Sequence, residues 1–85
     1  MALIELLYYG RLRDEIGRDR EPVDVPSHVL SVDDLVGWLR ARGEPYASAL
    51  AGPAIRAAVA GEWADGADSV FGAVEVAVLP PVGVL

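Results

Sequence analysis

Apolar and polar positions alternate along four short stretches of the chain, and this two-residue period predicts β-strands. The first stretch covers residues 3–9, where Glu5 interrupts an apolar run and marks the face that meets water. Residues 21–25 are short and precede a proline, which is typical of a strand at the edge of a sheet. Two further strands are expected at residues 55–59 and 74–79.

Between these stretches the apolar residues recur at the spacing of a helix. Residues 11–17 are expected to form one or two turns that end at a glycine. The clearest helix covers residues 32–42, because Ser31 is placed to cap it and Asp34 stands at the third helical position, as in a capping box. Residues 44–51 are expected to add another turn or two before a Gly-Pro pair.

The order of these elements predicts an α+β fold, in which one mixed sheet of about four to five strands is covered on one face by one main helix. Residues 61–72 are expected to be a loose connection. The valines of the last strand are expected to point into the core; they are Val74, Val76 and Val78. If the first and last strands pair at the centre, an apolar cluster gathers on the open face, namely Leu7, Tyr9 and Leu79, joined by Trp63. An exposed cluster of this kind usually marks a partner site.

Length and composition limit what such a small chain can do. Its 85 residues form one domain, and no stretch approaches the roughly 18 consecutive apolar residues that span a bilayer. The N-terminus reads directly into a strand without a basic region, so neither a signal peptide nor a transit peptide is expected, and a cytoplasmic location follows. The absence of cysteine excludes a disulfide framework, a cysteine nucleophile and a thiolate metal site.

The charge balance favours protein partners over nucleic acid. The net charge is −6, from thirteen acidic residues and seven arginines that are scattered along the chain. Phosphate contacts need a concentrated basic surface, so nucleic acid binding is not expected. An acidic domain more naturally meets a basic protein surface, although many domains are acidic for solubility alone.

Two other groups of polar side chains offer little chemistry. His28 lies near Asp24 and Ser31 in the sequence, but the spacing provides no nucleophile elbow, so a hydrolase-like triad is not expected. The carboxylates of the loose connection lack the ordered spacing of a calcium loop; they are Glu62, Asp65 and Asp68. We therefore expect these acids to be solvated.

The last six residues form a distinctive ending. Two consecutive prolines donate no backbone hydrogen bonds and fix φ, so the sheet should end at Leu79 and the remaining residues should leave it as an extended arm. The chain then divides into a domain at residues 1–79 and a projecting tail at residues 80–85. The tail consists of Pro80, Pro81, Val82, Gly83, Val84 and Leu85. We interpret it as an arm that inserts into a partner, with a frayed end as the alternative.

Three segments of the chain together resemble the small subunit of molybdopterin synthase, a ubiquitin-like β-grasp sulfur carrier. They are residues 7–17, with an Arg-Leu-Arg turn after the first strand, residues 54–59, and residues 76–82, with the Leu-Pro-Pro-Val ending. The resemblance covers nearly the whole chain. It implies the β-grasp fold and a role for the tail in molybdenum cofactor biosynthesis.

In that family the tail ends in two glycines, and an E1-like adenylyltransferase and sulfurtransferase uses ATP to adenylate the terminal carboxylate. Sulfur transfer gives a thiocarboxylate, and the tail then inserts into the large subunit of molybdopterin synthase. A carboxylate needs such activation because it is a poor electrophile. The resemblance implies a non-catalytic carrier of a sulfurtransferase complex, with these two proteins as partners. It implies no stably bound cofactor. From the charge balance, the lack of cysteine and the short apolar stretches, no metal site and no nucleic acid or membrane contact is expected.

Partner binding is assigned to the exposed cluster and to the first short helix. The residues are Tyr9, Arg11, Arg13, Trp63 and Leu79. The two arginines are suited to steering an acidic surface of the activating enzyme, with a solvated helix face as the alternative. No side chain of this chain is expected to be catalytic.

The sequence departs from the family at the tip of the tail. Val84 and Leu85 stand where the family has two glycines, so the chain as written cannot form a glycyl thiocarboxylate. Trimming to Gly83 would shorten the arm by roughly 7 Å, at about 3.3 to 3.6 Å per extended residue. The alternative function is therefore a β-grasp interaction module that binds the same partners but has lost the carrier reaction.

Overall fold

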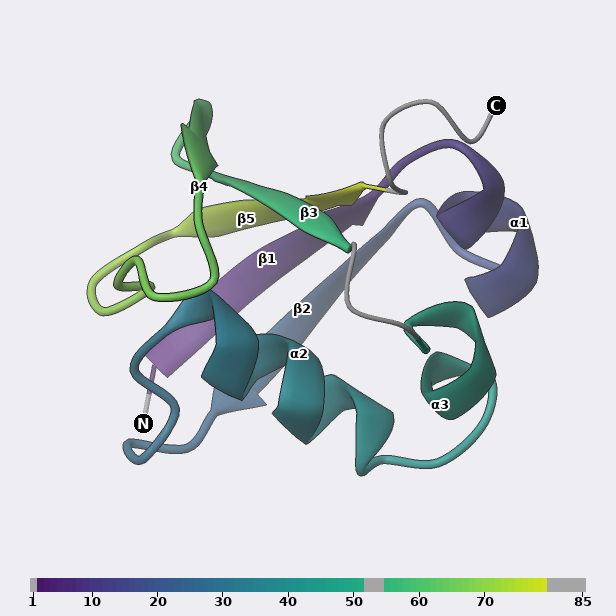
Figure 1. Ribbon diagram of the computed structural model, residues 1–85, viewed down its shortest axis with the longest axis horizontal. Coiled ribbons are helices and arrows are strands. Elements are labelled where there is room, and N and C mark those ends of the chain that lie inside the picture. Colours follow the sequence, from purple (N-terminus) through teal and green to yellow (C-terminus); the bar gives the residue numbers. More distant parts are fainter. Residues whose placement is uncertain (1, 52–54, 80–85) are drawn as a thin grey trace.

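A computed structural model describes residues 2–51 and 55–79, so the predicted tail at residues 80–85 lies outside the described part of the chain. The elements are β1 (Ala2–Tyr8), α1 (Arg11–Ile16), β2 (Arg20–Val25), α2 (Val32–Arg40), α3 (Tyr46–Ala49), β3 (Arg56–Val59), β4 (Glu62–Ala64) and β5 (Glu75–Leu79) (Figure 1). The predicted α+β class is confirmed. No helix within the described residues is long and apolar enough to cross a membrane.

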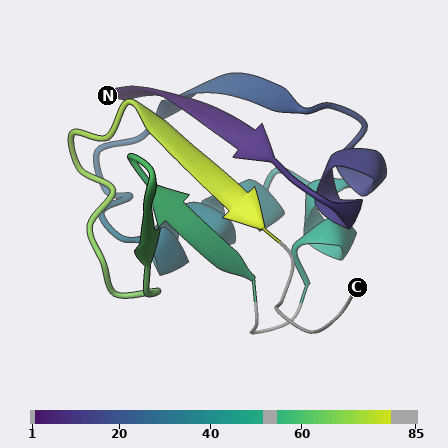
Figure 2. The ribbon, with the colours of Figure 1, turned by 90° about the horizontal axis from the view of Figure 1, so that it is seen from above.

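The five strands form one mixed sheet in the order β2-β1-β5-β3-β4. β1 and β5 are parallel neighbours, and the other three pairs are antiparallel. Figure 2 shows β1 and β5 side by side and pointing the same way. The predicted pairing of the first and last strands inside the sheet is therefore confirmed, as is the edge position of β2. Pro22 lies in that edge strand, where a missing N–H donor costs no ladder bond on the open side.

The core lies between the sheet and α2, which covers one face together with α3 (Figure 1). The predicted inward positions of β1 are almost fully buried, with Ile4 at 2% and Leu6 at 0% exposure. Val32, Leu35 and Leu39 bury the matching stripe of α2. Removing such apolar side chains from water stabilises the fold by about 1.5 to 3 kcal/mol each.

The start of α2 is held by the capping box that the sequence predicts. The Ser31 hydroxyl accepts a hydrogen bond from the Asp34 N–H at 3.1 Å, and the Asp34 carboxylate accepts one from the Ser31 N–H at 3.3 Å. The Leu30 N–H also donates a hydrogen bond to the Asp34 carboxylate, at 3.2 Å, and these two backbone donors, Leu30 and Ser31, hold the pKa of Asp34 below its usual range. The helix ends at Arg40, two residues earlier than expected, and the chain then turns at Gly43, whose φ is 95°.

Two expectations about the second half of the chain are wrong. The connection after residue 61 contains a strand, β4, which pairs antiparallel with β3. The hairpin turns at Ala60 and Gly61, both with positive φ of 53° and 84°, as a tight two-residue turn requires. Val74 does not point into the core but is 77% exposed, because β5 begins one residue later, at Glu75. Val76 and Val78 are buried as predicted.

Candidate functional site

The open face of the sheet carries a row of side chains that crosses all five strands. Strand register places Leu7 opposite Arg20 on one side and Ala77 on the other. Ala77 lies opposite Ala58, and Ala58 lies opposite Trp63. Because the two alanines are small, the middle of the row is low and its flanks are high.

The result is a shallow depression of about 280 Å³, which we call the alanine hollow. Its floor and walls come from β1 and the residue after it, from β3, β4 and β5, and from the hairpin turn. The lining residues are Leu7, Tyr9, Ala58, Gly61, Trp63, Glu75, Ala77 and Leu79. Tyr9 is 47% exposed and Trp63 is 62% exposed. The predicted clustering of Leu7, Tyr9 and Leu79 with Trp63 is confirmed. Its use as a partner site remains a prediction.

Charges of opposite sign flank the alanine hollow. The guanidinium carbon of Arg56 lies 4.3 Å from the centre of the Trp63 ring, so this cation and the aromatic face hold each other in place. At the other end of the hollow Glu75 lies opposite Glu5 in the strand register. Arg20 partly neutralises Glu5, at 3.7 Å between charged atoms. The alanine hollow therefore has an apolar centre, with a basic group on one side and two acids on the other.

The two arginines predicted to steer a partner belong to α1 and do not line the alanine hollow. Arg11 forms an i,i+4 ion pair with Glu15 at 2.7 Å, and both side chains are about two-fifths exposed. Arg13 is exposed and lines a separate open depression beside Arg18. An exposed ion pair such as Arg11–Glu15 contributes little to stability. The role of Arg11 and Arg13 in steering a partner stays a prediction.

Within residues 2–51 and 55–79 no group of three or more histidine or acidic side chains is placed to hold a metal ion. Two acids of the connection serve a local turn instead, because the Asp68 carboxylate accepts a hydrogen bond from the Asp65 N–H at 2.8 Å. Glu62 and His28 are exposed.

A buried carboxylate, Glu21, lies under the opposite face of the sheet, and the sequence analysis did not identify it. One of its oxygens accepts hydrogen bonds from the hydroxyls of Tyr8 at 3.0 Å and Tyr46 at 2.8 Å. The other accepts one from the Arg42 guanidinium at 3.0 Å, with Arg18 at 3.5 Å. We call these five residues the Glu21 network. It ties β1 and β2 to α3 and to the turn after α2.

The Glu21 network shifts the pKa values of Glu21 and Tyr8 in opposite directions. Burial raises the pKa of Glu21, but the hydrogen bonds from Tyr46, Arg42 and Tyr8 outweigh it, and the net pKa lies below the usual value. Burial and the neighbouring carboxylate raise the pKa of the Tyr8 hydroxyl far above its usual range. The signal in the sequence is that Glu21 has the same two-residue phase as the buried Val23 and Val25.

Comparison with known proteins gives a fold relationship. Neither a protein-family model nor a curated protein matches the chain. Among solved structures it is similar to a putative molybdopterin converting factor, subunit 1, from Pyrococcus furiosus, at 22% identity and a TM-score of 0.73, covering 96% of this chain and 100% of that one.

Two structures from Haloferax volcanii are also similar. SAMP1 matches at 25% identity and a TM-score of 0.63, over 96% of this chain and 98% of that one. A small archaeal modifier protein 1 structure matches at 28% identity and a TM-score of 0.60, over 96% and 100%. These neighbours support the resemblance predicted from the sequence, and the chain has the β-grasp fold of the ubiquitin-like sulfur carriers.

Proposed function

We propose that this chain is the sulfur-carrier small subunit of a molybdopterin synthase. In this proposal the alanine hollow docks on the large subunit, and the C-terminal tail inserts into it. The observation that carries the proposal is the position of Leu79, which lines the alanine hollow and immediately precedes the tail in the sequence. A partner that covers the hollow thereby meets the point from which the tail departs.

The proposed division of labour asks this chain for binding and not for catalysis. The apolar centre of the hollow suits the desolvated core of a protein interface, and the flanking charges suit its polar rim. An E1-like adenylyltransferase and sulfurtransferase would use ATP to activate the terminal carboxylate, so the ATP site belongs to that partner. Both partners and a cytoplasmic location are parts of the proposal.

A second candidate function follows from the tip of the tail. Val84 and Leu85 stand in place of the two glycines of the family, and both carry branched side chains. Glycine has no side chain and lets the backbone approach a partner closely, which the side chains of valine and leucine hinder. The alternative is a β-grasp interaction module that occupies the same partners without carrying sulfur.

Reconstitution with the activating enzyme separates the two candidates. The full chain is incubated with that enzyme, ATP and a sulfur donor, and its intact mass is measured. The carrier function predicts replacement of one oxygen by one sulfur at the C-terminus. An unchanged mass, with an enzyme shown to be active on another carrier, rejects it and leaves the interaction module.

Binding to the large subunit tests the docking surface separately. Tyr9→Glu and Leu79→Glu place a charge in the alanine hollow and should weaken the complex at least about tenfold, because a buried unpaired charge is costly. Phe71→Glu is the matched control, since Phe71 is 83% exposed and does not line that hollow. If the control weakens the complex as much as the other two variants, the assigned surface is wrong.

A further inference from the structure

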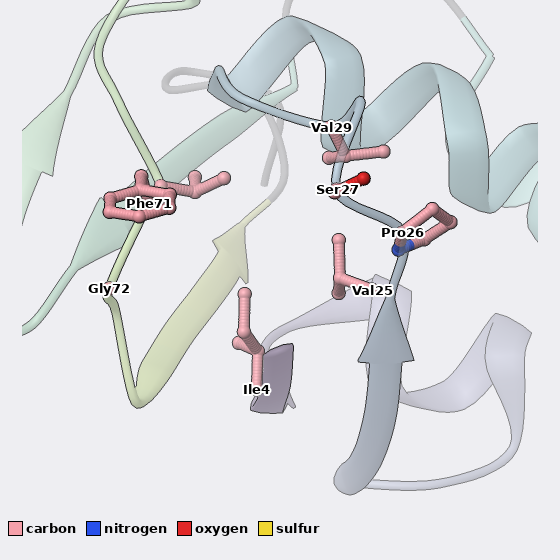
Figure 3. Close-up of a pocket in the computed structure, with 8 residues that line it drawn as sticks. Ile4, Val25, Pro26, Ser27, Val29, Phe71 and Gly72 are labelled. Atoms are coloured by element: carbon pink, nitrogen blue, oxygen red, sulfur yellow. The ribbon is translucent and has the colours of Figure 1, made fainter. Parts of the chain in front are cut away.

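A second depression lies at the other end of the sheet, away from the end of β5. It opens between the start of β1, the end of β2 and the turn before β5 (Figure 3). Its lining residues are Ile4, Val25, Pro26, Ser27, Val29, Val70, Phe71 and Gly72. Figure 3 shows Phe71 on one side and Pro26 on the other, with Ile4 and Val25 between them. We call this depression the end hollow.

The size and lining of the end hollow suit one apolar side chain. Its volume is about 90 Å³, whereas a cavity of about 150 Å³ takes up benzene. Ser27 supplies the one polar side chain of the lining, so a bound water would find few partners there. A leucine or methionine side chain from outside would instead bury apolar surface against Ile4 and Val25.

Exposed apolar side chains continue from the end hollow onto the surface. Phe71 is 83% exposed, Val74 is 77% exposed and Leu30 is 54% exposed. The Val70 N–H donates a 2.9 Å hydrogen bond to the Leu30 carbonyl, which holds these two segments side by side. Single exposed apolar residues are ordinary, but a set that adjoins an apolar hollow marks a docking surface.

The charges at this end are acidic. Asp24 is the last but one residue of β2 and lies opposite Leu3. Asp33 and Asp34 lie in the first turn of α2, and Glu75 begins β5. Asp68 is held there too, because its carbonyl accepts a hydrogen bond from the Val32 N–H at 3.0 Å. None of these five acids forms an ion pair with any residue of the described part of the chain.

The arginines lie at the opposite end of the domain. They lie in α1 and the turn after it, at the start of β2, at and after the end of α2, and at the start of β3. They are Arg11, Arg13, Arg18, Arg20, Arg40, Arg42 and Arg56. The acidic end therefore keeps its negative field. A surface that attracts cations and offers an apolar hollow is complementary to a basic, partly apolar segment.

We propose that the end hollow, with Leu30, Phe71 and Val74 around it, is a second docking surface for a basic segment of a partner protein. One apolar side chain of that segment fills the hollow, and lysine or arginine residues on either side meet the acids. This proposal does not rest on the carrier function, because the alanine hollow is a different surface. The chain can hold one partner here while its other end is engaged.

Selection from a library of short random peptides tests this proposal. The full chain has no cysteine, so Asp14→Cys on exposed α1 gives one attachment point at the far end of the domain. We expect enriched peptides to carry a large apolar residue next to lysine or arginine. Binding of such a peptide should fall at least about tenfold in Phe71→Ser and should weaken with added salt. Trp63→Ser, in the alanine hollow, is the matched control and should leave binding unchanged.

Several outcomes would overturn the proposal. Enrichment of acidic peptides, of peptides that depend on Trp63, or of no peptide that depends on Phe71 would each contradict it. If sedimentation shows a dimer that Phe71→Ser dissociates, the occupant is a second copy of the chain and the proposed basic partner is wrong. Circular dichroism checks folding. The charge-only pair Asp24→Asn and Asp33→Asn, which lines neither hollow, gives an independent reading, since it should reduce binding and its salt dependence.

Discussion

Loss of the buried Glu21 carboxylate should destabilise the domain far more than loss of an exposed carboxylate that lies as close to its own arginine. Glu21→Ala leaves the hydroxyls of Tyr8 and Tyr46 without their acceptor, and both tyrosines are buried, at 1% and 8% exposure. An unpaired buried hydroxyl costs about 1 to 3 kcal/mol. Arg42 has a side chain exposed by 32%, so water replaces much of its lost ion pair and we assign it no more than about 1 kcal/mol.

The sum for Glu21→Ala is about 2 to 7 kcal/mol, because two hydroxyls and one partly hydrated arginine lose their partner. A domain of this size has a free energy of unfolding of roughly 4 to 13 kcal/mol, at about 0.05 to 0.15 kcal/mol per residue. Glu21→Gln keeps an oxygen for the tyrosines and loses only the charge, so its cost should be about 1 to 2 kcal/mol. Glu15→Gln is the matched control, since its pair with Arg11 is shorter, at 2.7 Å, but exposed.

Urea unfolding measures these differences, with tryptophan fluorescence from Trp38 and Trp63 as the signal. We expect Glu15→Gln to change the free energy of unfolding by less than about 0.5 kcal/mol. Burial then decides the cost, and the distance between charges does not. Equal changes in the free energy of unfolding for Glu21→Gln and Glu15→Gln would refute this reasoning. A loss below about 1 kcal/mol in Glu21→Ala would refute it too, because the contacts in the folded state predict at least about 2 kcal/mol.

Four further predictions concern the pH dependence of stability, the helix cap and the alanine hollow. The pKa of Glu21 is lower in the folded than in the unfolded protein, where it is about 4.5. Its stabilising effect is therefore present above the unfolded pKa and is lost as pH falls through the folded pKa. When urea midpoints are measured against pH, they should fall less steeply on the acid side in Glu21→Gln than in the wild type. The folded pKa of Tyr8 is raised, so its contribution is present below pH 10.0 and declines as pH rises above it; Tyr8→Phe should flatten the alkaline limb of the same curve, and an unchanged limb would contradict the assignment. Ser31→Ala removes the acceptor for the Asp34 N–H and should cost about 1 kcal/mol in urea unfolding, with no loss if another group caps α2. Ala77→Leu should fill the alanine hollow, leave the free energy of unfolding within about 0.5 kcal/mol and weaken large-subunit binding at least about tenfold by calorimetry; unimpaired binding would show that the hollow is not the docking surface.

The sequence predicted those features that a short-range pattern determines. Alternation in β1 assigns Leu6 to the core and Leu7 to the open face, and the structure confirms both. The capping box at Ser31 is a local contact between residues three apart, so it was readable without the fold. The apolar cluster of the alanine hollow was predicted because alternation within β1 and β5 also determines which of their side chains face outward.

The missed features depend on distant residues or on unusual turn chemistry. An Ala-Gly pair turns the β3–β4 hairpin, whereas Asn-Gly or Asp-Gly is the usual signal. Val74 keeps the right phase but precedes the first ladder position of β5, so no neighbouring layer covers it. Glu21 also has the inward phase, and its burial is tolerated only because Tyr8, Arg42 and Tyr46 arrive from 13, 21 and 25 residues away. That compensation is invisible before the fold is known.

The carrier function is tested most directly by the intact mass of the protein isolated from its own cells while they make molybdenum cofactor. The measurement reads the terminal residue and any sulfur on it together, and fragmentation locates both to the residues after Leu79. The account predicts a species in which one sulfur replaces one oxygen at the C-terminal carboxyl group. A single species with an ordinary carboxylate under these conditions would contradict it and favour the interaction module.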